Sequence, residues 1–216
     1  MRDRSPFFFI HVYKNLGSTL YSQFPENYNK RFYGMKSLNQ WKMENRSTIR
    51  QSFKYESGRP GYLDGVSKFA IDHLNLDSCY EIGILDDFDF KWREFIAIVR
   101  NPIDRFVSIC NFTKKSPDEL LNEFNPNLTQ TNPLKTKKKI NLTLIQMERP
   151  DLITSHFKNF NIHLNLNIRL NESRKEISKQ DLTEDQINEY KMKFSDDFNL
   201  YQKVLDNGGI IKNFTF

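Results

Sequence analysis

The sequence predicts an α/β domain in which a mainly parallel central sheet is flanked by helices. Two short apolar runs, residues 7–12 and 94–99, have the composition of buried strands. Each run is followed by a polar loop and then by a helical pattern, and this alternation is typical of a parallel, helix-covered sheet. A chain of 216 residues can bury a substantial core in one domain. We therefore expect residues 1–216 to form a single domain.

The middle of the chain contributes less regular patterns. Residues 64–74 place apolar side chains at helical spacing, and residues 142–148 have the composition of a third strand. Residues 162–170 alternate apolar and polar side chains, which predicts a half-exposed strand. The segment 125–141 contains two prolines and a run of lysines, and we expect it to be an exposed linker or lid.

The C-terminal part of the chain predicts a long amphipathic helix. Thr183 and Gln186 have the spacing of a capping box, which marks a helix start. The helical pattern continues to about Leu205, and the sequence Asn-Gly-Gly at 207–209 should end it.

Charge and composition narrow the classes of partner. The net charge of +5 favours an anionic partner, although a lysine-rich solvated surface would give the same value. The two cysteines, Cys79 and Cys110, cannot form a disulfide framework, and neither has His or Cys neighbours at metal-ligand spacing. Cys110 should be an inert core thiol. Without an apolar run of membrane-spanning length or a signal-peptide pattern, we expect a soluble, cytoplasmic protein with no membrane span and no metal.

A first candidate site follows the first strand. Residues 9–20 read F-I-H-V-Y-K-N-L-G-S-T-L, which predicts a strand, a glycine-containing loop and a helix. Unpaired N–H groups at such a helix start bind anions, and Lys14, Ser18 and Thr19 add a charge and two hydroxyls. Lys14 precedes Gly17 by three residues, which does not fit a Walker loop, so a kinase or ATPase is disfavoured. An ordinary strand–turn–helix remains an alternative.

A second candidate site follows the second strand. Residues 95–108 read F-I-A-I-V-R-N-P-I-D-R-F-V-S. Arg100, at the strand end, can bind a phosphate with both arms of its guanidinium group. Ser108, two helical turns further on, can reach the same group. Asp104 and Arg105 have a structural interpretation, in which they brace the loop and cap the helix.

Together these two segments resemble the two nucleotide-binding motifs of the sulfotransferases that use 3′-phosphoadenosine-5′-phosphosulfate (PAPS). The first segment is similar to the 5′-phosphosulfate loop of the carbohydrate branch, usually F-I-H-x-P-K-T-A-G-T-S-L, with Tyr13, Asn15 and Leu16 as departures that alter the shape of the loop. The second resembles the family's V-R-N-P-x-D-R-x-V-S motif, which binds the 3′-phosphate. Weaker similarities continue at 144–148, 171–173 and 196–201.

The resemblance implies the P-loop-like sulfotransferase fold and transfer of a sulfuryl group by in-line displacement. The donor is PAPS, the product is adenosine 3′,5′-bisphosphate (PAP), and the acceptor is a hydroxyl, on a sugar or glycan by family analogy. No nucleic-acid partner is expected. The nucleotide-binding residues that the resemblance implies are Lys14, Asn15, Leu16, Gly17, Ser18, Thr19, Arg100, Ser108 and Ser173.

Two residues receive catalytic roles. Lys14 should stabilise the oxygen that bridges phosphorus and sulfur as negative charge grows there, although it could instead only neutralise phosphate charge. His73 is the candidate general base, because many carbohydrate sulfotransferases carry a histidine at a comparable place. A lone histidine is more often structural, and the competing carboxylates are those of Glu56, Asp64 and Asp72.

An alternative function from a different class is also open. A non-catalytic protein on the same fold could hold a nucleotide or a nucleic acid without turnover, and the positive charge and the lysines at 135–139 favour that hypothesis. Retention of Lys14, Arg100 and Ser108 together favours the enzyme. The variable segments 25–62 and 113–141 would determine which acceptor is used.

Overall fold

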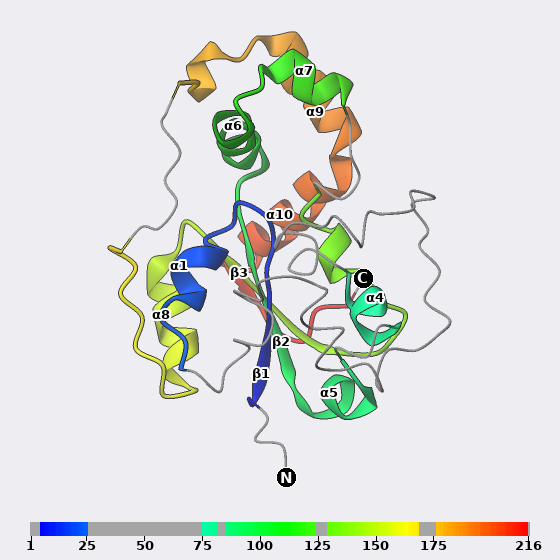
Figure 1. The fold of residues 1–216 in the computed structure, drawn as a ribbon, viewed down its shortest axis with the longest axis vertical. Coiled ribbons are helices and arrows are strands. Elements are labelled where there is room, and N and C mark those ends of the chain that lie inside the picture. Colours follow the sequence, from blue (N-terminus) through cyan, green and yellow to red (C-terminus); the bar gives the residue numbers. More distant parts are fainter. Residues whose placement is uncertain (1–4, 26–74, 82–84, 124–128, 169–175, 216) are drawn as a thin grey trace, which may run out of the picture.

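The expected α/β architecture is present in the computed structural model (Figure 1). The model describes residues 5–25, 75–81, 85–123, 129–168 and 176–215. In these residues a mixed sheet has the order β1-β2-β3-β4. The first three strands are parallel and β4 is antiparallel to β3. The strands are β1 Phe7–Ile10, β2 Glu94–Val99, β3 Asn141–Gln146 and β4 Ile210–Ile211. The three predicted strands around residues 7, 94 and 142 are thus confirmed, with shorter limits at two of them.

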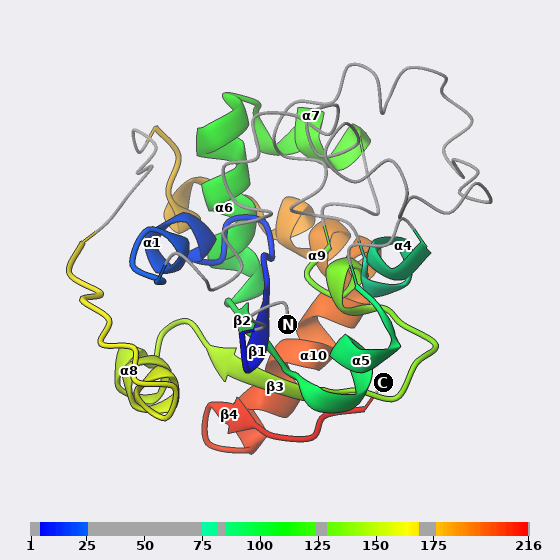
Figure 2. The ribbon, with the colours of Figure 1, turned by 60° about the horizontal axis from the view of Figure 1, so that its bottom comes forward.

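Helices cover both faces of the sheet, and three more pack together beyond the strand ends (Figures 1 and 2). α1 and α8 lie on one face, and α4, α5 and α10 on the other. α6, α7 and α9 share a separate apolar cluster. The helices are α1 Gly17–Tyr21, α4 Leu76–Glu81, α5 Asp87–Trp92, α6 Pro102–Thr113, α7 Pro117–Asn122, α8 Pro150–Lys158, α9 Glu184–Lys193 and α10 Ser195–Asp206, with short 3₁₀ turns at Asn132–Leu134 and Lys179–Asp181.

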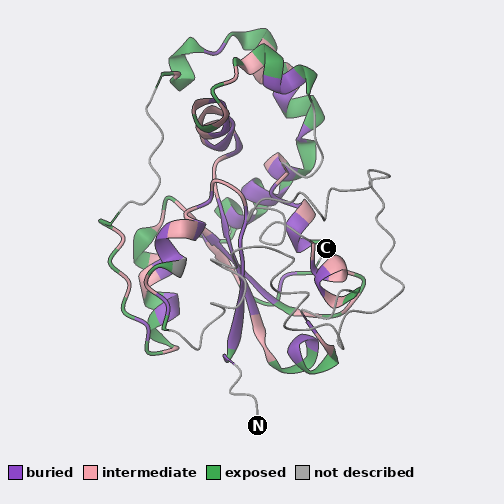
Figure 3. Ribbon diagram, viewed as in Figure 1, coloured by how far each residue is buried: buried purple, intermediate pink, exposed green. Residues whose placement is uncertain are grey.

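The two-residue period of the strands divides the core into two layers. In β1, Phe7 and Phe9 face α1 and α8, whereas Phe8 and Ile10 face α4, α5 and α10. Figure 3 shows these central strands as buried. Both faces of the sheet are apolar because both are covered, which explains why the strands read as continuous apolar runs.

The third cluster supports the helix that follows the second motif. Phe106 and Cys110 of α6 pack against Tyr190 of α9, and the rings of Phe106 and Tyr190 are stacked with centroids 4.3 Å apart. Burial raises the pKa of the Cys110 thiol to about 11, so it is an inert core thiol, as expected. α6 is therefore a rigid support for the residues at its start.

Two sequence expectations were wrong in the C-terminal half. Residues 162–168 form no strand, because this segment runs beside α1, where the Gln23 side chain donates to the Asn165 carbonyl at 3.1 Å. The long helix is divided at Phe194, whose φ of −119° separates α9 from α10. Phe194 is buried in the apolar cluster with α6 and α7, so tertiary packing replaces helical continuity there. The Thr183 capping box and the stop after Asp206 are confirmed.

The expected linker at 125–141 was also assigned wrongly in part. Gln130 is fully buried, and Thr131 and Leu134 are buried beside it. This part of the segment forms polar contacts within the protein and is not an exposed lid. The helix expected at 64–74, and all but the first residue of the segment 25–62, lie outside the described residues.

Candidate functional site

The two sequence motifs meet at one edge of the sheet. Because β1 and β2 are neighbouring parallel strands, the loops that leave their carboxyl ends emerge on the same side. The Arg100 guanidinium donates from Nη1 to the Lys14 carbonyl oxygen at 3.1 Å, across 86 positions of sequence. Ligands bind at this edge in open α/β sheets, so the structure places both motifs where a ligand site is expected.

The first loop has an unusual backbone. Lys14 and Leu16 have φ values of 63° and 68°, in the left-handed region. That conformation costs roughly 1–2 kcal/mol for a residue with a Cβ atom. The Asn15 N–H donates to the Val12 carbonyl at 3.2 Å, which tightens the turn. Leu16 precedes α1 and packs its side chain against the apolar layer under α1 and α8.

Gly17 is required by a close approach. A Cβ atom at this position would lie 1.8 Å from Cδ2 of His11, so the imidazole occupies the space that a side chain would need. His11 is buried directly after β1. The pair fixes the path of the chain from β1 into α1, and the structure gives His11 this packing role.

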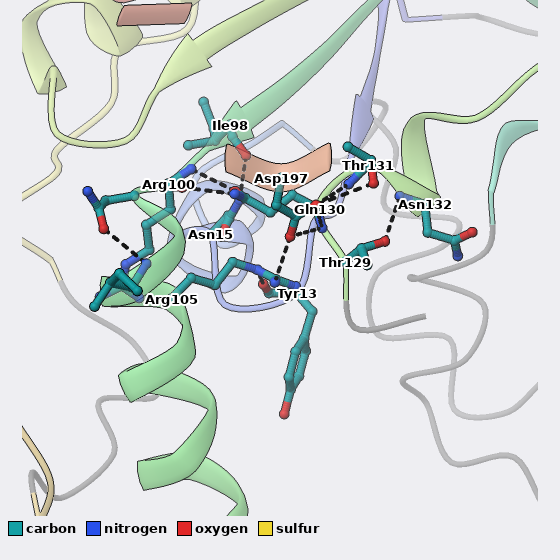
Figure 4. A network of polar contacts seen from close by, with 12 residues as sticks. Tyr13, Asn15, Ile98, Arg100, Arg105, Thr129, Gln130, Thr131, Asn132 and Asp197 are labelled. Carbon is teal, nitrogen blue, oxygen red and sulfur yellow. Dashed lines mark hydrogen bonds and ion pairs between the residues drawn. The ribbon is translucent and has the colours of Figure 1, made fainter. Parts of the chain in front are cut away.

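Gln130 joins the two loops (Figure 4). Its side-chain oxygen accepts hydrogen bonds from the Arg100 N–H at 2.8 Å and from Asn15 Nδ2 at 2.7 Å. Its amide nitrogen donates to the Arg100 carbonyl at 2.9 Å. Asn15 Nδ2 also donates to the Ile98 carbonyl at 2.8 Å. One buried side chain thereby holds the first loop against the end of β2.

A buried ion pair supports this contact from below (Figure 4). Arg105 of α6 and Asp197 of α10 are fully buried, with 3.5 Å between Arg105 Nη1 and Asp197 Oδ2. Arg105 Nε donates to the Tyr13 carbonyl at 2.9 Å, and the Asp197 carboxylate accepts from the Gln130 N–H at 2.8 Å. Burial raises the pKa of the Asp197 carboxyl, while Arg105 and the Gln130 and Thr131 amides oppose that shift.

Lys14 lies in a positive environment. Burial and the neighbouring Arg100 charge both lower the pKa of its ammonium group. The Lys14 Nζ atom lies 4.4 Å from the centre of the Phe112 ring, which is within cation–π range. Two cations held side by side repel each other, so this pair favours an anion as a third partner.

The start of α6 is organised by residues of the second motif. The Asn101 side chain accepts from the N–H groups of Ile103 and Asp104, at 3.0 and 3.2 Å. Asn101 therefore provides the cap, and Asp104 instead pairs with Lys179 at 2.7 Å. The bracing role expected for Arg105 is confirmed, whereas the capping role expected nearby belongs to Asn101.

Of the remaining predicted site residues, three lie within the described part of the chain and the others lie outside it. Ser18 and Thr19 lie in the first turn of α1, with Ser18 partly exposed and Thr19 buried. The first N–H groups of a helix have no acceptor within it, and in α1 these include the N–H groups of Gly17 and Ser18. Ser108 is partly exposed on α6. Outside the described residues lie His73 and Ser173, and with them Glu56, Asp64 and Asp72.

Three residues of the site were not assigned from the sequence. Gln130 lies in the segment expected to be exposed, and Asp197 lies within a weakly similar segment for which no role was inferred. Phe112 looked like an ordinary residue at the end of an apolar helix. Their contacts join parts of the chain that are distant in sequence, and no local pattern encodes such contacts. A polar Gln-Thr directly before Asn-Pro was the only signal at Gln130.

Three searches, for a metal site, a membrane-spanning helix and similar proteins, gave negative results. Within the described ranges, no group of three or more His, Cys, Asp or Glu side chains is placed to hold a metal ion. In the same ranges, no helix is both long and apolar enough to span a membrane. Comparison with family models, curated proteins and solved structures finds no match to this chain.

Proposed function

We propose that this protein is a sulfotransferase on a P-loop-like fold that transfers a sulfuryl group from PAPS to an acceptor hydroxyl. The observation that carries the proposal is that two cationic residues, Lys14 and Arg100, are neighbours at the carboxyl ends of β1 and β2. Arg100 contacts the backbone of Lys14, and its charge lowers the Lys14 pKa. The acceptor is a sugar or glycan by family analogy.

Two like charges in a partly buried place destabilise each other unless an anion lies between or beside them. Arg100 and Lys14 are held there by Gln130, Asn15 and the loop backbone, so the protein maintains the repulsion. A ligand with phosphates and a sulfate at its two ends would relieve it.

The proposed roles combine the sequence resemblance, which alone supplies those of His73 and Ser173, with the described positions of the other residues. Arg100 and Ser108 bind the 3′-phosphate, and the Gly17 and Ser18 amides bind the 5′ end. Lys14 stabilises the charge that grows on the oxygen leaving sulfur. Burial and the Arg100 charge lower the pKa of this ammonium group from its ordinary value of 10.5. His73 would accept the proton of the acceptor hydroxyl, and Ser173 would close over the nucleotide.

A nucleotide-binding experiment tests the donor assignment. Calorimetry should show that PAP binds more tightly than 5′-AMP, because the 3′-phosphate contacts Arg100. Arg100→Ala should remove most of that preference. Lys191→Ala, which removes one positive charge from an exposed site on α9, should leave it unchanged. Equal affinity of the wild type for the two nucleotides would overturn the donor assignment.

A turnover experiment tests the reaction. With PAPS and a panel of sugar acceptors, Lys14→Ala should lower kcat about a hundredfold, with a smaller change in donor affinity. If Lys14→Ala instead raises the donor KM and leaves kcat intact, Lys14 only neutralises phosphate charge and has no catalytic role. Tight PAP binding without turnover by the wild type would favour the non-catalytic nucleotide-binding protein instead.

A further inference from the structure

An aromatic side chain outside both sequence motifs contacts the proposed catalytic lysine. Phe112 lies near the C-terminal end of α6, four residues after Ser108, and 41% of it is exposed. Lys14 Nζ lies 4.4 Å from its ring centre. The Tyr13 ring meets the same ring edge to face, with centroids 5.7 Å apart. The residue before Lys14 therefore supports the ring that Lys14 contacts.

The exposure of Phe112 needs an explanation. The adjoining apolar residues of α6, Ile109 and Cys110, are buried in the cluster with α7 and α9, whereas Phe112 is not. A phenylalanine that is 41% exposed contributes less to core packing than a buried one. The negative face of its ring attracts an ammonium group, and Lys14 is the residue placed to use it.

Arg100, the second neighbour of Lys14, limits the positions that the Lys14 ammonium group can take. Arg100 is anchored to the Lys14 carbonyl, and its charge repels the Lys14 ammonium. A lysine side chain has four rotatable bonds, so repulsion alone would leave its charge in many positions. The Phe112 ring gives the ammonium one favourable position beside the loop. Repulsion from Arg100 and attraction to the Phe112 ring together restrict where the charge can lie.

We propose that Phe112 is a positioning residue that holds the Lys14 ammonium at the strand-end site, with Tyr13 supporting its ring. The importance of this position for sulfuryl transfer rests on the proposed function. The contact itself does not, because it depends only on the two side chains. Holding the charge in place lowers the reorganisation needed when negative charge develops on the donor.

Nuclear magnetic resonance tests the contact without any turnover. A ring directly below an ammonium shifts the adjacent ε-methylene protons upfield, and the Lys14 signals are assigned from their loss in Lys14→Arg. Phe112→Leu should remove the upfield shift, and Phe112→Trp should keep it. The matched control is Phe88→Leu, which alters a phenylalanine that is 49% exposed on α5. Unshifted Lys14 signals in the wild type, or shifts that persist in Phe112→Leu, would overturn the proposal.

Kinetics test what the contact is for. Phe112→Leu should lower kcat roughly threefold to tenfold, with PAP affinity unchanged, and Phe112→Trp should restore kcat. Loss of the upfield shift with a normal kcat would refute the positioning role. A wild type that binds PAP but never turns over PAPS would contradict the proposed function, and the resonance experiment would then decide on the Phe112 contact by itself.

Discussion

Asp197→Asn is the substitution that tests most directly how the site is supported. Asparagine has nearly the shape of aspartate, so the change removes charge without creating a cavity. The Asp197 carboxylate accepts from the Gln130 N–H through both oxygens, at 2.8 Å each, and from the Thr131 N–H at 3.1 Å. It also faces the guanidinium of Arg105 at 3.5 Å.

The expected loss can be worked out from these contacts. Asn keeps one oxygen, which can still accept from the Gln130 and Thr131 N–H groups, but it places an NH₂ group beside the Arg105 guanidinium where Oδ2 was. It also leaves the fully buried Arg105 charge without its counter-ion. Removing one partner of a buried ion pair costs about 3–5 kcal/mol. We expect the free energy of unfolding to fall by that amount.

Urea unfolding at pH 7 measures this loss, with Asp196→Asn as the matched control. Asp196 is the preceding residue on α10 and is exposed, so its change should be close to neutral, within about 0.5 kcal/mol. A second variant, Arg105→Met with Asp197→Leu, removes both charges and should recover part of the stability. A loss below about 1 kcal/mol for Asp197→Asn would refute the reasoning, because the pair would then carry no net stabilisation.

Two further predictions concern parts of the fold that the site depends on. Burial acts to raise the pKa of the Glu94 carboxyl, but hydrogen bonds from His156 and Thr143 outweigh it and leave the pKa below its ordinary value. A lowered folded pKa gives stability that is complete above the unfolded pKa and is lost as pH falls through the folded pKa. Glu94→Gln should therefore be less stable than the wild type at pH 6, with a smaller difference near pH 3, and an equal difference at both values would contradict this assignment. Gly17→Ala should lower the free energy of unfolding by about 1–3 kcal/mol, because its Cβ atom would lie 1.8 Å from the His11 ring. In a urea titration, adding His11→Ser to Gly17→Ala should remove most of that loss, and a double variant no more stable than the single would show that the clash is elsewhere.

Part of the fold could be predicted because its signals are local. The strands are apolar runs long enough to be buried on both faces, and β1, β2 and β3 lie where those runs are. The start of α6 is marked by Pro102 after a strand, since Pro fits the first turn of a helix, although the residue that caps it was assigned wrongly. The Thr183 capping box could be predicted for the same reason. Each of these patterns depends on residues within a few positions of one another.

Other features could not be predicted because they depend on distant partners. Residues 162–168 alternate like a strand but have no strand edge to pair with, so they follow α1 instead. The division of the last helix at Phe194 has no Gly or Pro to mark it, and Phe194 is buried there in a cluster with residues of α6 and α7. A lysine-rich segment near Gln130 looked exposed because composition cannot show that one of its side chains is buried.

The sequence by itself determined the α/β class, the positions of the main strands and the candidate ligand residues Lys14 and Arg100. The tertiary structure alone decided that the Arg100 side chain meets the backbone of Lys14, because only parallel pairing of β1 and β2 brings their loops to one edge. It also decided which residues hold them there: Gln130 between the loops, Asp197 below and Phe112 beside the lysine. The physical reason is the range of the forces involved. Strand and cap signals act within a few residues, whereas a buried hydrogen bond or a ring under an ammonium group joins atoms that only the folded chain brings together.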